Sequence, residues 1–172
     1  MLVAFGGLPG SGKTTLAKRL AQKLAAVYLR IDTIEQAIRS SDVLRDDVGP
    51  AGYIAAYKLA EENLSIGRIV VADSVNALRI TRNSWMEIAQ NAHVALVEVE
   101  VVCSNLVEHQ RRVENRPSDL EGMPPLTWQA VVERLFEPWS TPHIVVDTAG
   151  KSISEAEEEL SQRLEILRLL SA

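Results

Sequence analysis

Eight residues near the start of the sequence, Gly7-Leu8-Pro9-Gly10-Ser11-Gly12-Lys13-Thr14, have the spacing of a loop that binds nucleotide phosphates. Glycines allow the backbone to wrap closely around phosphate oxygens, and a following helix would add the positive end of its dipole. We expect Lys13 to contact the outer phosphates and the Thr14 hydroxyl to hold Mg²⁺. The pattern suits ATP and GTP alike. The residues expected to bind the nucleotide at this loop are Gly7, Pro9, Gly10, Ser11, Gly12, Lys13, Thr14 and Thr15.

Two aspartates each follow an apolar run, Asp32 after residues 27–31 and Asp73 after residues 69–72. If both runs are strands of an open parallel sheet, their carboxyl ends meet at the ligand crevice. Asp73 then resembles an acid that holds Mg²⁺ directly or through water, and Asp32 can take a proton from an acceptor hydroxyl. The two roles can be exchanged. Each aspartate also suits a helix cap or a turn, which is the plainer interpretation.

Arginines and one asparagine follow these aspartates along the chain. A guanidinium group presents a planar fork to phosphate or carboxylate, which would suit an anionic acceptor, and an amide can orient one. For each of these residues, a solvated surface charge or a turn is the alternative. The residues expected to bind the acceptor are Asp32, Arg39, Asp73, Asn76, Arg79 and Arg82.

A second basic cluster, Arg111, Arg112 and Arg116, precedes a stretch with three prolines and a glycine, residues 117–125. Arg112 and Arg116 are four residues apart and would share a helix face. We predict a lid over approximately residues 111–126, whose arginines neutralise the transferring phosphoryl group and help to exclude water. The alternative is a solvated helix face in which these arginines pair with neighbouring glutamates.

Apolar runs alternate with amphipathic segments along the whole chain. This alternation predicts one α/β domain over residues 1–172, with a parallel sheet between two layers of helices. The expected strands are residues 2–5, 27–31, 69–72, 94–102 and 144–146. The expected longer helices are residues 13–24, 53–64, 84–92, 105–115 and 127–136, with a last helix opened by the capping box of Ser152 and Glu155.

Bulk composition narrows the classes of function. The 172 residues carry a net charge of −5, which argues against broad nucleic-acid binding, and no apolar run approaches the length of a membrane span. The first expected strand follows Met1 directly, without the basic segment that begins a signal peptide, so we expect no signal peptide. The single cysteine, Cys103, fits a cytoplasmic protein. The three histidines, His93, His109 and His143, show no metal-ligand spacing and suit surface or core positions.

Taken together, these residues resemble the small P-loop kinases related to nucleoside monophosphate kinases, shikimate and gluconate kinases and adenylylsulfate kinase. Within that group, the chain is similar to AAA-domain ATP-binding proteins described as predicted kinases. The resemblance implies a three-layer fold with a five-stranded parallel sheet, a lid after the fourth strand, and Mg-ATP as phosphoryl donor. It also implies nucleotide contacts near the adenine from Asp147 and Thr148. The matching residues are 7–14, Asp32 with Arg39, Asp73 to Asn76, Arg82, Trp85, Arg111, Arg112, Arg116, 136–139, Asp147 and Thr148.

We therefore hypothesise an ATP-dependent phosphotransferase that acts on a hydroxyl of a small molecule. Lys13, Thr14 and Mg²⁺ would hold the donor, Asp32 would activate the acceptor, and Arg112 and Arg116 would stabilise the transition state. One alternative is a kinase of nucleotides or of polynucleotide 5′-hydroxyls, which the acidic net charge disfavours for polynucleotides. Another is a nucleotide-dependent binding module with slow hydrolysis. The sequence leaves the acceptor and the oligomeric state open.

Overall fold

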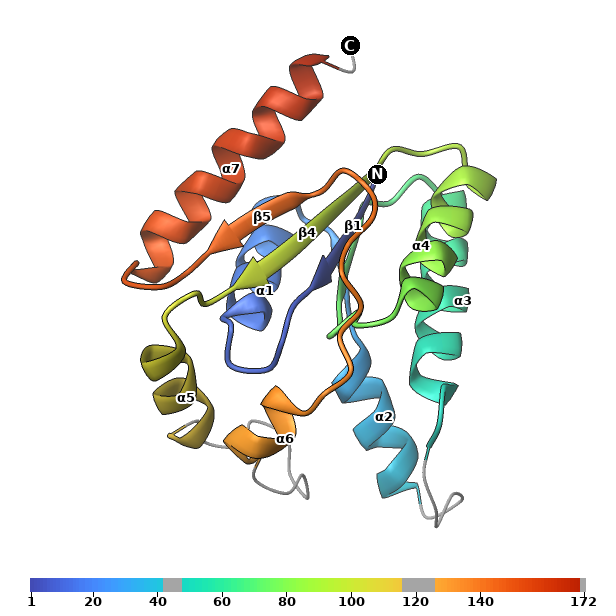
Figure 1. The fold of residues 1–172 in the computed structure, drawn as a ribbon. Coiled ribbons are helices and arrows are strands. Elements are labelled where there is room, and N and C mark those ends of the chain that lie inside the picture. Colours follow the sequence, from blue (N-terminus) through green and yellow to red (C-terminus); the bar gives the residue numbers. More distant parts are fainter. Residues whose placement is uncertain (42–47, 116–125, 171–172) are drawn as a thin grey trace.

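Five parallel strands form the centre of the molecule, in the spatial order β2-β3-β1-β4-β5 (Figure 1). The computed structural model describes residues 1–41, 48–115 and 126–170. The first strand lies in the middle of the sheet, because Ala4 is paired with Ala72 on one side and with Glu98 on the other. The parallel sheet predicted from sequence is confirmed. The strands are β1 (Leu2–Gly6), β2 (Val27–Arg30), β3 (Val70–Asp73), β4 (Leu96–Val102) and β5 (Ile144–Asp147).

Helices cover both faces of this sheet, so the predicted three layers are confirmed (Figure 1). Helices α1 and α7 pack on one face, and α3 and α4 pack on the other. Helices α2, α5 and α6 lie near the carboxyl ends of the strands. The helices are α1 (Lys13–Lys23), α2 (Ile31–Ser40), α3 (Ala51–Ser65), α4 (Arg79–Asn91), α5 (Leu106–Glu114), α6 (Trp128–Val132) and α7 (Ile153–Leu170).

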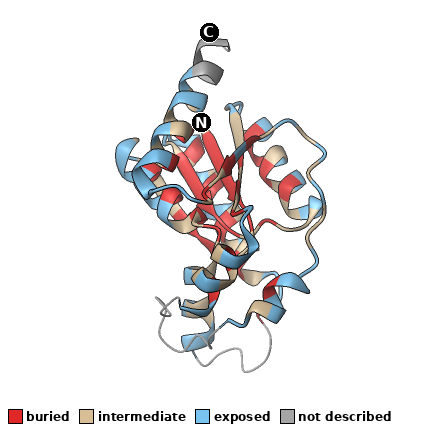
Figure 2. Cartoon of the chain, turned by 60° about the vertical axis from the view of Figure 1, so that its left-hand side comes forward, coloured by how far each residue is buried: buried red, intermediate tan, exposed pale blue. Residues whose placement is uncertain are grey.

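Alternate side chains of β1 enter two separate hydrophobic cores. Val3 and Phe5 pack with α1 and α7, whereas Leu2 and Ala4 pack with α3 and α4. All four side chains are fully buried, which explains why this strand is apolar throughout instead of alternating with polar residues. Figure 2 shows this pattern, with buried strands at the centre and exposed outer faces on the helices.

Several predicted boundaries are wrong, and one of them affects the site. The second strand ends at Arg30, and α2 begins at Ile31, so Asp32 lies in the first turn of a helix instead of following a strand. Helix α4 begins at Arg79, five residues before the expected start, and α6 ends at Val132, well before residue 136. Most of the predicted lid, with Arg116, lies outside the described residues.

The segment of residues 133–143, between α6 and β5, contacts polar side chains of β4. Thr141 Oγ1 donates a hydrogen bond of 2.8 Å to Glu98, and a ring nitrogen of His143 lies 3.2 Å from Glu100. These contacts give partners to the two glutamates that alternate with valines along β4. The alternate side chains Val97, Val99 and Val101 pack in the core on the opposite face.

No helix among the described residues is long and apolar enough to cross a membrane.

Trp85 is the largest fully buried side chain and packs edge-on against Tyr57, with 4.6 Å between ring centroids. We expect Trp85→Ala to lower the free energy of unfolding by about 3–5 kcal/mol, because the substitution leaves a large cavity in the core. Urea denaturation checks this value. Ile80→Ala on the same helix is the control, since Ile80 is 71% exposed and its loss should change stability by less than about 0.5 kcal/mol. Equal effects of the two substitutions would contradict the described packing of α4.

Candidate functional site

The glycine-rich loop runs from the end of β1 to the start of α1, as the motif predicts. Gly7 has a φ of +135°, and a Cβ atom there would lie 2.2 Å from the carbonyl oxygen of Val101. Gly10 has a φ of +84°, and a Cβ atom there would lie 2.6 Å from Val113 Cγ2. Both positions therefore require glycine, for backbone conformation and for space.

Several backbone amides of this loop are available to bind an anion. Among the described residues, no protein group accepts a hydrogen bond from the amides of Gly10, Gly12, Lys13 or Thr14. Lys13 and Thr14 begin α1, so their amides also lie at the positive end of that helix. This set of unpaired N–H groups is the arrangement that binds phosphate oxygens.

Asp73, the last residue of β3, is a buried carboxylate beside this loop. Its side chain is 1% exposed, and its Oδ1 atom lies 3.4 Å from Lys13 Nζ. Tyr28 donates a hydrogen bond of 2.7 Å to Asp73 Oδ2. Burial and the charge of Asp73 together raise the pKa of the Tyr28 phenol, so it remains a hydrogen-bond donor.

The arrangement around Asp73 fits a magnesium–nucleotide complex. Asp73 Oδ1 is buried and has no hydrogen-bond partner among the described residues. Carboxylate and hydroxyl oxygens are ligands that Mg²⁺ prefers, and its other positions are commonly filled by water and phosphates. The described residues contain no cluster of three or more His, Cys, Asp or Glu side chains able to hold a metal alone. Asp73 and Thr14 are therefore the residues that would hold Mg²⁺ together with the nucleotide.

Arg30 lies between the two aspartates predicted from sequence. Its Nη2 atom is 3.6 Å from Asp32 Oδ2, and its Nε atom is 4.0 Å from Asp73 Oδ2. The structure thus brings both aspartates to one place, although Asp32 belongs to α2. Their exposures differ, because the Asp32 side chain is 27% exposed and Asp73 is closed to solvent. Sequence reasoning missed Arg30, although a charged residue inside an apolar strand run was a usable signal.

The arginines expected to bind an acceptor lie in different surroundings. Arg39 is exposed and pairs with Glu35 one turn earlier on α2, at 3.4 Å. Arg79 is exposed at the start of α4, and its backbone amide donates to the Glu137 carboxylate. Within the described part of the chain, neither arginine pairs with Asp32 or Asp73, so their acceptor role stays a prediction.

Arg82 has a structural role that the sequence prediction did not anticipate. It is 5% exposed, and its guanidinium donates to the carbonyl oxygens of Glu137 and Pro138 at 3.0–3.3 Å. It also lies 4.6 Å from the centre of the Trp139 ring. Its donors hold the segment 133–143 in place, and its contact with an acceptor stays a prediction.

Asn76 occupies a buried turn after β3. Its φ of +50° is one that asparagine tolerates better than most residues. Its Oδ1 atom accepts a hydrogen bond of 2.8 Å from Thr81, and its backbone amide donates to the Tyr53 hydroxyl at 3.2 Å. The turn interpretation therefore accounts for its position.

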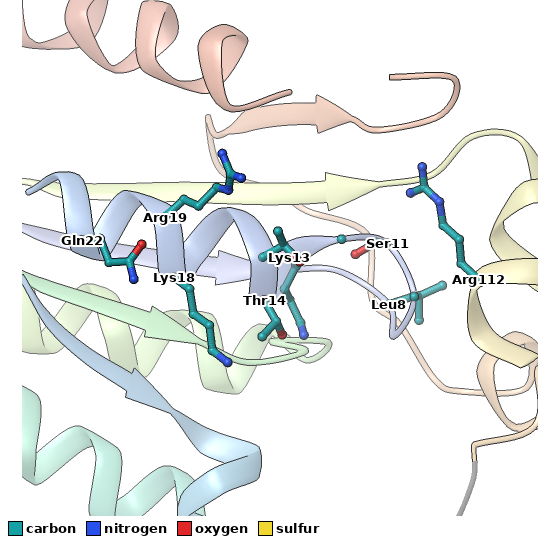
Figure 3. Close-up of a pocket in the computed structure, with 11 residues that line it drawn as sticks. Leu8, Ser11, Lys13, Thr14, Lys18, Arg19, Gln22 and Arg112 are labelled. Atoms are coloured by element: carbon teal, nitrogen blue, oxygen red, sulfur yellow. The ribbon is translucent and has the colours of Figure 1, made fainter. Parts of the chain in front are cut away.

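Two cavities adjoin the loop, one of about 560 Å³ and one of about 260 Å³. The larger is lined by the loop, the exposed side of α1 and Arg112, and Figure 3 shows Lys13, Thr14 and Lys18 directed to the same side of α1. The smaller lies between the loop and the start of α7, and Arg112 and Thr148 both line it. This geometry brings Arg112 and Thr148 together beside the phosphate loop.

Arg112 is held in place by neighbouring groups. It donates to the hydroxyl and the carbonyl oxygen of Thr148, at 2.7 and 3.0 Å, and to Glu108 at 2.7 Å. A hydrogen bond from the Gly150 amide and the nearby Arg112 guanidinium lower the pKa of Glu108, although burial opposes them. The sequence allowed a solvated helix face on which this arginine pairs with a glutamate, and the pairing with Glu108 is present. The guanidinium nevertheless lines both cavities and is not fully solvated. Its action on a transferring phosphoryl group stays a prediction.

The Asp147 carboxylate lines neither of these two cavities, and its contact with a nucleotide stays a prediction. It accepts hydrogen bonds from the amide and hydroxyl of Ser104 and from the Ala149 amide. The carboxylate thus fastens the end of β5 to the residues after β4. The neighbouring Thr148 lines the smaller cavity, and its hydroxyl donates to the Ser11 carbonyl oxygen at 2.8 Å; its contact with a nucleotide also stays a prediction.

Comparison with known proteins gives a consistent fold. Residues 2–138 match a family model described as AAA domain. A shikimate kinase from Synechococcus elongatus is 30% identical over 131 residues, which cover 74% of this chain and 67% of the relative. Two solved structures are similar to this chain in fold.

The first of these is an APS kinase from Mycobacterium tuberculosis in complex with AMPPNP and APS. It superposes with a TM-score of 0.70 at 19% identity, covering 95% of this chain and 96% of that chain. The second is Kti12 from Chaetomium thermophilum in complex with ADP-AlF3. It gives a TM-score of 0.69 at 23% identity, covering 96% and 98% of the two chains.

The role of Asp147 can be tested through pH. Burial would raise the pKa of this carboxyl, but hydrogen bonds from Ser104 and Ala149 outweigh it and lower the pKa below its ordinary value of 3.8. The ionised form therefore contributes stability above pH 3.8, and this contribution is lost as the pH falls through the lowered value. We expect Asp147→Asn to lower the free energy of unfolding by about 1–2 kcal/mol at pH 7 and by much less in acid.

Urea denaturation across that pH range measures the difference between the wild type and Asp147→Asn. Glu62→Gln on the exposed face of α3 serves as the control for removing one negative charge. A difference that does not change with pH would contradict the assigned hydrogen bonds.

Proposed function

The chain belongs to the AAA-domain family of P-loop proteins, and from this membership we propose that it is an ATP-dependent phosphotransferase acting on a hydroxyl of a small molecule. The observation that carries the proposal is the pair of aspartates joined by Arg30 beside the phosphate loop. One carboxylate is buried against Lys13, and the other remains open to solvent. A protein that only bound or hydrolysed a nucleotide would not need the second, exposed carboxylate at this position.

The donor would be held by the loop. The unpaired amides of the loop and Lys13 would bind the phosphates, while Thr14 and Asp73 would hold Mg²⁺. When bound, this ion would neutralise negative charge on the phosphate oxygens. Asp73 suits the metal role better than Asp32, because its free oxygen is buried and lies within 3.4 Å of the loop lysine.

The acceptor would be activated by Asp32. An acceptor hydroxyl beside Asp32 would form a bond to the γ-phosphorus, and the bond from that phosphorus to the bridging oxygen of ATP would break. The hydroxyl proton would pass to the Asp32 carboxylate, and ADP would leave. Arg30 would orient Asp32 for this step through the ion pair at 3.6 Å.

The relatives support the class of reaction. The similar protein from Synechococcus elongatus is a shikimate kinase, and the similar fold from Mycobacterium tuberculosis is an APS kinase. We propose the same type of transfer for this chain, with a small-molecule acceptor whose identity the test below must find.

The proposal predicts ADP release that depends on an acceptor. Purified protein with Mg²⁺ and ATP would be screened against polyols, sugars, hydroxy acids, nucleosides and a 5′-hydroxyl oligonucleotide, with coupled detection of ADP. We expect one class of small hydroxyl compound to accelerate ADP release and Lys13→Met to abolish it, because the lysine charge on the outer phosphates is lost.

Two results would contradict a small-molecule acceptor. Slow ADP release that no acceptor changes would favour a nucleotide-dependent binding module. Phosphorylation of the oligonucleotide alone would favour a polynucleotide kinase.

Asp32→Asn separates the two aspartate roles. We expect it to lower kcat with the identified acceptor by about 10²–10⁴-fold, because the proton acceptor is lost. The affinity for Mg-ATP, measured by calorimetry, should remain unchanged. Glu62→Gln, which removes one exposed charge from α3, is the matched control. A loss of Mg-ATP affinity with kcat preserved would show that Asp32 serves the metal instead.

A further inference from the structure

Helix α5 packs against the outer side of the phosphate loop (Figure 1). Its His109 is 5% exposed, and the ring Nε2 atom lies 2.8 Å from the carbonyl oxygen of Pro9. The next turn of α5 contributes Val113, which leaves no room for a side chain at Gly10. The loop is therefore supported by a helix whose His109 lies 100 residues after Pro9 in the sequence.

A carbonyl oxygen can only accept a hydrogen bond, so His109 Nε2 must carry a proton for this contact to be attractive. The contact then fixes the direction of the Pro9 carbonyl. In a planar trans peptide, the carbonyl of one residue and the amide of the next point in opposite directions. A hydrogen bond that holds the Pro9 carbonyl toward α5 therefore turns the Gly10 amide away from α5.

The Gly10 amide is one of the loop amides without a partner among the described residues. It belongs to a loop whose residues 10–15 line the larger cavity. A second peptide of the loop follows the same geometry, because the Ser11 carbonyl accepts a hydrogen bond of 2.8 Å from Thr148 and the following Gly12 amide is also unpaired. The peptide groups Pro9–Gly10 and Ser11–Gly12 are thus each held by a hydrogen bond to the carbonyl oxygen, which leaves the amide unpaired.

We propose that His109 is a positioning residue for nucleotide binding, whose Nε2–H holds the Pro9 carbonyl and thereby directs the Gly10 amide toward the phosphates. This inference rests on the proposed binding of ATP at the loop, but not on any particular acceptor. His109 touches no substrate and acts through the backbone of the loop.

The surroundings of His109 separate this role from simple packing. The ring makes an edge-to-face contact with Trp128 of α6, with 5.1 Å between centroids. A leucine could fill much of the same apolar space, but it could not donate a hydrogen bond to Pro9. A glutamine could donate one from a similar distance along its side chain. Substitution by leucine or by glutamine therefore distinguishes the effect of side-chain volume from the effect of the hydrogen-bond donor.

The test compares His109→Leu and His109→Gln by calorimetric titration with ATP, tripolyphosphate and adenosine in the presence of Mg²⁺. We expect His109→Leu to weaken ATP and tripolyphosphate binding by about fivefold, which corresponds to one neutral hydrogen bond, and to leave adenosine binding unchanged. His109→Gln should restore most of the affinity. Gln110→Leu, the next residue on α5, is the control for a change in the helix itself.

Three binding results would overturn the inference. These are unchanged ATP affinity in His109→Leu, equal losses in the leucine and glutamine variants, and an equal loss for adenosine. A wild-type protein that binds no nucleotide would instead overturn the proposed function, and this inference with it. Thermal unfolding of each variant shows whether it is folded.

The hydrogen bond from His109 can also be tested in the wild-type protein, without any substitution. The chain has three histidines, so nitrogen-15 NMR of their rings is simple to assign. We expect His109 to carry its proton on Nε2, with slow exchange of that proton against solvent. An unprotonated Nε2 atom in the neutral ring would overturn the assigned hydrogen bond.

Discussion

The site is organised around one carboxylate that has been removed from water. A buried Asp73 would be costly without compensating positive charge and hydrogen bonds. Lys13 from the loop, Arg30 from β2 and Tyr28 from the same strand supply them. Because these groups come from the loop and from β2, while Asp73 belongs to β3, satisfying a single charge fixes three segments relative to one another. Arg30 also pairs with Asp32, so the position of Asp32 at the start of α2 depends on the same group of charges.

A second constraint concerns the backbone of the loop. Amides that are to bind phosphate must stay unpaired, so those particular N–H groups cannot hold the loop in place. The structure holds it by its carbonyl groups instead, through His109 and Thr148. Arg112 joins these supports, because it hydrogen-bonds to Thr148 from the same helix as His109. Binding groups arranged in this way need little reorganisation when a ligand arrives.

The sequence predicted the parts of this arrangement that depend on local chemistry. Apolar runs identify the buried strands, and the glycines of the loop identify its backbone conformation, because both follow from neighbouring residues. Contacts between residues that are distant in the chain could not be predicted from the sequence. Arg82 and Asp147 are charged residues at plausible positions, but backbone groups of the segments they contact decide their roles. His109 gave no usable signal, since its partner is a carbonyl oxygen, which every residue possesses.

The central position of β1 also has a consequence for the dynamics of the protein. A strand flanked on both edges and buried on both faces can exchange its amide hydrogens only when much of the domain opens. The phosphate loop is a direct continuation of this strand, so it begins at a part of the chain that should open last. The segments that would meet an acceptor, such as α2 beside the edge strand β2, begin at a part that can open locally. The molecule thus combines a fixed donor side with a more adaptable acceptor side.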